Sequence, residues 1–160
     1  MTVCFVAGHA EDAPEGFWRA LLPARHFRSP AVVVEAKGAR ETALQADTVW
    51  IHQPTSFAAA DLAEEAAKLG KRVIIDLSED PWLRHEIGRD YNEHRLGACR
   101  RALAACDVLV VTSEGLAVTF RSICADVRVI ELVVALDGWG VREPAEPPVL
   151  AWWSDGRQRL

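Results

Sequence analysis

The stretch from Gly70 to Trp82 constrains the fold of this chain more than any other. It reads Gly-Lys-Arg-Val-Ile-Ile-Asp-Leu-Ser-Glu-Asp-Pro-Trp, so a short apolar run at 73–75 ends abruptly at a group of acids. An unbroken apolar run of this length is typical of a parallel strand that is buried on both faces. Ligands of open α/β sheets bind beyond the carboxyl ends of the strands, so we expect the acidic end to be the functional edge. The side chains expected there are Asp76, Ser78, Glu79 and Asp80.

Strand-like and helix-like segments alternate along the rest of the chain. The other apolar runs of strand length are 2–6, 31–34, 48–52, 107–112 and 127–134. Helical patterns fall at 15–27, 38–45, 56–69 and 90–105, and a further helix begins at Ser113. Right-handed crossovers between such strands predict a doubly wound, mainly parallel sheet of about six strands with helices on both faces. We therefore expect one Rossmann-like α/β domain over 1–143, followed by a proline-rich connector and a terminal strand over 144–160.

The overall charge argues against two classes of partner. The net charge is −5, which gives no general attraction to nucleic acid or to anionic lipid. No apolar run reaches the roughly 18 residues needed to span a bilayer, and the start of the chain does not read as a signal peptide. We expect a cytoplasmic protein. The four cysteines form no Cys-x-x-Cys pair, and we interpret them as small core residues and not as a disulfide framework or a zinc site.

Three segments resemble a known family, in the order and spacing that its members show. Residues 70–82 resemble the segment "GKRVVYDLDDDLW" in the amino-terminal half of glycosyltransferases with two Rossmann-like domains (the GT-B fold). Residues 104–117, which read Ala-Ala-Cys-Asp-Val-Leu-Val-Val-Thr-Ser-Glu-Gly-Leu-Ala, resemble that family's "AADLVTVSTEALA". A third segment, 127–139, resembles "VRVIPNAIDPELW". Together the matches extend over about residues 48–139.

The chain departs from that family in three places. Ser78 stands where members often have Asp, Leu132-Val133 replaces a Pro-Asn pair, and only 149–156 resemble the first strand and turn of a second domain. The resemblance therefore implies the acceptor-side domain of a glycosyltransferase that uses a nucleotide-sugar donor, inactive alone. It implies no tightly bound cofactor, because the donor is expected only with a second domain. The alternative is a free-standing α/β binding or scaffold protein that kept the fold without catalysis.

Histidines lie at two expected strand ends. His9 and His52 fall on the same expected edge of the sheet, and Gln53 follows the second of them. An imidazole there could act as a general base or bind a hydroxyl group, and the alternative is a loop histidine without such a role. The acids Asp76, Glu79 and Asp80 could bind the hydroxyls of a glycan or protein acceptor. Their alternative role is to cap the next helix, and we assign no metal site and no catalytic residue.

Other polar and aromatic residues complete the set of candidates. Ser113 and Glu114 are expected where a strand meets a helix, a place suited to a hydroxyl or an anion, although helix capping explains both. Trp82 and Trp139 follow strand ends and could stack on a sugar. Trp152 and Trp153 would contact a second domain or a second copy in a homodimer if they are exposed, and otherwise would pack back onto the domain.

Overall fold

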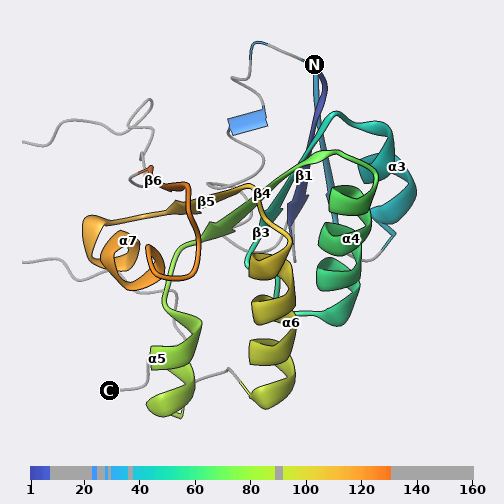
Figure 1. The fold of residues 1–160 in the computed structure, drawn as a ribbon. Helices are drawn as coiled ribbons and strands as arrows, with labels where there is room; N and C mark the ends of the chain where they lie inside the picture. The colour runs from blue at the N-terminus through green and yellow to red at the C-terminus, as the bar shows by residue number, and fades with distance from the viewer. Residues whose placement is uncertain (8–22, 25–27, 29, 36–37, 89–91, 131–160) are drawn as a thin grey trace, which may run out of the picture.

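The computed structural model describes residues 1–7, 23–24, 28, 30–35, 38–88 and 92–130 (Figure 1). Several predictions lie outside these residues. They concern His9, most of the helix at 15–27, Trp139, and the connector and terminal strand with Trp152 and Trp153.

The described residues form one parallel sheet of six strands. Its spatial order is β2-β1-β3-β4-β5-β6, and every neighbouring pair is parallel. This confirms the predicted Rossmann-like α/β fold. The strands are β1 (Val3–Ala7), β2 (Ala31–Glu35), β3 (Thr48–His52), β4 (Arg72–Leu77), β5 (Val108–Val111) and β6 (Val127–Val129).

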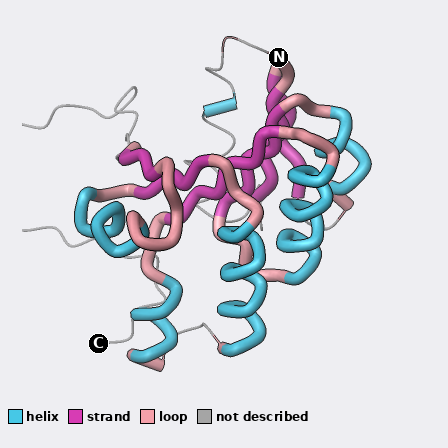
Figure 2. The backbone as a smooth tube through the Cα atoms, viewed as in Figure 1, coloured by secondary structure: helices cyan, strands magenta, loops and turns pink. Residues whose placement is uncertain are grey.

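Helices follow four of these strands. They are α3 (Arg40–Gln45), α4 (Phe57–Lys68), α5 (Pro81–Glu86), α6 (Glu93–Ala104) and α7 (Glu114–Phe120). Figure 2 shows the strands side by side as one layer, with these helices to one side of it. Right-handed crossovers explain this arrangement, because the chain moves in one direction across the sheet from β2 to β6.

Each face of the sheet packs into its own apolar cluster. The larger cluster lies beneath the helices and contains Val49, Ile51, Val73, Ile75, Leu109 and Val111. The smaller cluster is on the opposite face, where Phe5 and its β1 neighbours pack with Trp50 and Ala24. Strand side chains alternate between the two faces, so Trp50 and His52 share the face opposite the helices.

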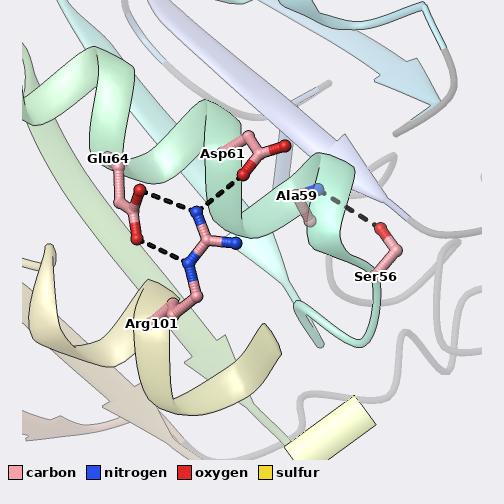
Figure 3. Close-up of polar contacts among 5 residues, drawn as sticks. All are labelled: Ser56, Ala59, Asp61, Glu64 and Arg101. Atoms are coloured by element: carbon pink, nitrogen blue, oxygen red, sulfur yellow. Dashed lines mark hydrogen bonds and ion pairs between the residues drawn. The ribbon is translucent and has the colours of Figure 1, made fainter. Parts of the chain in front are cut away.

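The sequence signals around α4 explain its bounds. Ser56 Oγ accepts a hydrogen bond from the backbone N–H of Ala59 at 3.2 Å, which caps the first turn (Figure 3). Gly70 follows the helix with φ +69°, a left-handed conformation that costs glycine little. Both positions agree with the predicted helix over 56–69.

Arg101 joins α4 to α6 through hydrogen-bonded ion pairs. Arg101 Nε and Nη2 donate to the two carboxylate oxygens of Glu64, both at 2.8 Å, and Nη2 also donates to Asp61 at 2.7 Å (Figure 3). Its guanidinium carbon lies 5.5 Å from the ring centre of Phe57. Arg101 therefore holds the two longest described helices side by side.

Three large apolar side chains at helix ends are exposed. Ile123 is 55% exposed and Leu69 is 58% exposed, and Phe57 lies at the surface against Arg101 and His94. Each lies at or beyond an end of its helix: α7 ends at Phe120, α4 ends at Lys68, and Phe57 opens α4. The helical periodicity does not continue past a helix end, so the buried stripe stops there.

Candidate functional site

The candidate site lies at the carboxyl edge of the sheet, where β3, β4 and β5 end side by side. From β1 the chain runs to β2 on one side, and β3 then lies on the other side of β1. The strand order therefore reverses between β1 and β3, and ligands of open α/β sheets bind at such a switch point. His52 is the last residue of β3, directly at this place.

A buried pair occupies this edge. His52 is 5% exposed and Asp76 is 1% exposed, and the two are in register on β3 and β4. His52 Nδ1 lies 3.4 Å from Asp76 Oδ2, and Trp50 Nε1 donates to the same oxygen at 3.4 Å. Neither ring nitrogen of His52 has a hydrogen-bond partner within the described residues. A buried polar atom without a partner is unusual and calls for an explanation such as a bound group.

Gln53 continues the site toward solvent. Its Nε2 donates to Ser78 Oγ at 2.7 Å, and its backbone N–H donates to the carbonyl of Asp76 at 2.9 Å. Its φ of +48° is the one positive value among the described non-glycine residues. Thr112 Oγ1 donates to the Ser78 carbonyl at 3.1 Å, which joins the ends of β4 and β5. Gln53, Ser78 and Thr112 are half-buried, so their polar groups form the accessible margin of the buried pair.

Two of the acids predicted for this edge have structural contacts. Asp80 caps α5, because its Oδ1 accepts from the backbone N–H groups of Trp82 (2.9 Å) and Leu83 (3.2 Å). Proline at the next position favours a helix start, so Asp80-Pro81 is the local signal for α5, and the alternative that these acids cap the next helix is confirmed for Asp80. Glu79 forms an ion pair with Arg84 at 2.7 Å.

The remaining candidates lie at the same edge but face other groups. The centre of the Trp82 ring lies 5.7 Å from the centre of the Phe120 ring. The guanidinium carbon of Arg100 lies 5.9 Å from the centre of the Trp82 ring. Ser113 caps α7, since its Oγ accepts from the backbone N–H of Leu116 at 3.3 Å. Glu114 is 72% exposed and pairs with Arg121 at 3.0 Å. The structure therefore brings His52, Gln53, Asp76 and Ser78 together and gives the other described candidates capping, packing or ion-pair contacts.

Sequence reasoning missed two members of the site. Trp50 precedes His52 by two positions, so strand alternation places both on one face, and its indole N–H reaches Asp76. Thr112 directly follows β5, the strand next to β4, and only the strand order shows that it meets Ser78.

The face opposite the helices also carries a groove of about 190 Å³. Trp50, Ile74 and Val110 contribute apolar side chains to it, and Arg72 and Arg128 contribute positive charge. Arg72 begins β4, so the groove extends toward the amino ends of the strands, away from the edge that binds ligands in such sheets. We therefore place the candidate site at the carboxyl edge.

Two features are absent from the described residues. These residues contain no cluster of three or more histidine, cysteine or acidic side chains that could hold a metal ion. Among them, too, no helix combines the length and the apolar character that crossing a membrane requires.

Compared with known protein families, with curated proteins and with solved structures, the chain matches none. The function must therefore be argued from the site itself.

Proposed function

We propose that this chain is the acceptor-side Rossmann-like domain of a glycosyltransferase that uses a nucleotide-sugar donor, and that it is inactive without a second domain. The observation that carries the proposal is the buried His52 beside Asp76 at the topological switch point. A carboxylate beside Nδ1 orients an imidazole so that Nε2 can accept a proton. In this role Nε2 of His52 would bind or deprotonate an acceptor hydroxyl.

The neighbouring groups suit a hydroxyl-rich ligand. Gln53 offers an amide and Ser78 a hydroxyl, and both are half-buried beside the pair. Such groups bind sugar hydroxyls by donating and accepting hydrogen bonds. A sugar acceptor must be held close to the donor's reactive carbon, and a rigid edge of this kind supplies that positioning.

The positions of the segments that resemble the glycosyltransferase family support a binding site at the same edge of the sheet. Residues 70–82 form β4 and the start of α5, and residues 104–117 form β5 and the start of α7. β4 and β5 are neighbours in the sheet, so the carboxyl ends of these two strands lie side by side. The hydrogen bond from Thr112 to Ser78 joins them directly.

A second candidate is the free-standing binding or scaffold protein. The contacts of Asp80, Trp82, Ser113 and Glu114 favour it, because capping, packing and ion pairing explain these residues without a ligand. This candidate leaves the buried Nε2 of His52, which has no hydrogen-bond partner among the described residues, without an explanation, so we rank it second.

A thermal-shift titration tests the proposal. The 160-residue chain is titrated with a panel of mono- and oligosaccharides, free nucleotides and nucleotide sugars. A ligand at 100 times its Kd stabilises the native state by about 2.7 kcal/mol, which raises Tm by roughly 5 to 10 °C in a protein of this size. We expect such a shift with a glycan and none with a nucleotide.

Matched variants locate the site. Gln53→Ala and Ser78→Ala should abolish the glycan shift, whereas Glu86→Gln, which removes an exposed charge at the end of α5, should keep it. A nucleotide-induced shift that disappears in Gln53→Ala would mean a donor site at this edge and would refute the acceptor-side assignment. No shift with any sugar would favour the scaffold protein.

A further inference from the structure

Two cysteines that are distant in the sequence lie in contact. Cys106 Sγ and Cys124 Sγ are 3.0 Å apart, although 18 positions separate the residues. Cys106 lies between α6 and β5, and Cys124 lies between α7 and β6. Backbone hydrogen bonds hold each in place, from Cys106 N–H to Leu103 O (3.3 Å) and from Cys124 N–H to Phe120 O (3.0 Å). The contact therefore joins the starts of two neighbouring strands.

We propose that Cys106 and Cys124 are an oxidation site, at which a small disulfide oxidant such as oxidised glutathione converts the two thiols to a reversible intramolecular disulfide. A disulfide has an S–S length of about 2.05 Å, so the sulfur atoms need to approach by only about 1 Å. Two thiolates on one tetrahedral zinc ion, each at about 2.3 Å from the metal, would stand about 3.8 Å apart. The observed separation therefore fits a disulfide better than a shared metal, and no third ligand joins the pair among the described residues.

The different exposure of the two thiols sets the order of the steps. Cys106 is half-buried, whereas Cys124 is only 6% exposed, so Cys106 is the thiol that a reagent can reach. The Cys106 thiolate attacks oxidised glutathione, a mixed disulfide forms, and one reduced glutathione leaves. Cys124 then loses its proton and attacks the Cys106 sulfur, and the second glutathione leaves. Two protein thiols are oxidised and one glutathione disulfide is reduced to two thiols.

The local environment makes the first step slow at neutral pH. Burial raises the pKa of the Cys106 thiol, and the neighbouring Cys124 thiol raises it further. Because the thiolate is the nucleophile, the reaction should accelerate as pH rises toward that pKa. The disulfide would form at the amino ends of β5 and β6, opposite the edge that carries His52 and Asp76, so we expect oxidation to leave ligand binding there unchanged.

The experiment oxidises the native protein in a glutathione redox buffer at pH 8. The reaction is stopped with acid, the remaining thiols are alkylated, and disulfides are assigned by intact mass and peptide mapping. We expect the free thiols to fall from four to two, with one linked peptide pair that contains Cys106 and Cys124. Dithiothreitol should restore all four thiols.

Single variants test the order of the steps. Cys124→Ser should trap glutathione on Cys106, whereas Cys106→Ser should give no adduct. Cys99→Ser is the control, because Cys99 is buried and burial raises its pKa to about 12, so its loss should leave the disulfide intact.

Other outcomes would overturn the proposal. These are four free thiols retained in every redox buffer, or a disulfide that contains Cys4 or Cys99. The peptide map of the unmodified chain decides between them even if a variant fails to fold.

Discussion

Replacing Asp76 by alanine should destabilise the protein by about 3 kcal/mol. The carboxylate is 1% exposed, lies 3.4 Å from His52 Nδ1 and accepts a hydrogen bond from Trp50. Removing one member of a buried ion pair costs about 3 to 5 kcal/mol when the other stays charged. Leaving a neutral buried group without its partner costs about 1 to 3 kcal/mol. The lower limit of the first range and the upper limit of the second coincide at about 3 kcal/mol, which is therefore the loss of stability that we expect. Asp76→Asn should cost less, about 1 kcal/mol, because its amide oxygen can still accept from Trp50.

Urea denaturation followed by far-UV circular dichroism measures these differences. Equal m-values among the variants would show that only stability has changed. Glu86→Gln serves as the control, since removing an exposed charge should change stability by no more than about 0.5 kcal/mol.

A double-mutant cycle then tests whether the pair acts as a unit. If His52 and Asp76 interact as their geometry indicates, the variant with both residues changed to alanine should be more stable than the sum of the single effects predicts, by about 1 to 3 kcal/mol. Additivity within about 0.5 kcal/mol would refute this reasoning. Asp76 would then support the sheet edge independently of His52.

Four further predictions concern the rest of the domain. Phe120→Ala should cost about 3 to 5 kcal/mol because the ring is fully buried, whereas Ile123→Ala, at a site 55% exposed, should cost no more than about 0.5 kcal/mol in the same urea assay. Arg101→Ala should lower the urea midpoint, and Arg101→Lys should lie between it and wild type, because lysine cannot reproduce the two-pronged contact with Glu64. Hydrogen bonds from Thr2 hold the pKa of Asp47 below its usual value, so its contribution to stability is present above about pH 4 and is lost as pH falls through the folded pKa. Asp47→Asn should remove that part of the acid dependence, measured as the urea midpoint against pH. Gln53→Gly should remain within about 1 kcal/mol of wild type, because relief of the positive φ offsets the lost side-chain hydrogen bond, and Gln53→Ala should be less stable than Gln53→Gly.

The sheet could be predicted from the sequence because each strand carries its own signal. The unbroken apolar runs of β4 and β5 indicate burial on both faces, and the Ser56 and Ser113 caps mark where helices begin. Right-handed crossovers then leave few topologies. α5 is only six residues long and carries no apolar stripe of useful length, so its cap and its proline are its only local signals.

The site was harder to predict because its members come from different strands. Asp76 could be recognised as the polar end of an apolar strand, but its position opposite His52 depends on the register of β3 and β4. The Gln53–Ser78 hydrogen bond also depends on this register, because it joins residues 25 positions apart. Local pattern indicates which residues reach the edge, and only pairing between strands shows which of them meet.

Two local costs at this edge bear on the choice between a binding domain and a scaffold. Gln53 holds a left-handed conformation that disfavours a non-glycine residue by about 1 to 2 kcal/mol, and His52 keeps a buried Nε2 without a hydrogen-bond partner among the described residues. A glycine in place of Gln53 would remove the first cost without changing the sheet. In a domain that serves only as a scaffold, the Gln53–Ser78 hydrogen bond would do no more than offset the strain at Gln53, and the buried Nε2 of His52 would have no use. In a binding domain the left-handed backbone of Gln53 directs its side chain to Ser78. The free Nε2 of His52 would then accept a hydrogen bond from a hydroxyl group of the ligand. The position of these costs, at the switch point of the strand order and not elsewhere in the described sheet, therefore favours a ligand at this edge.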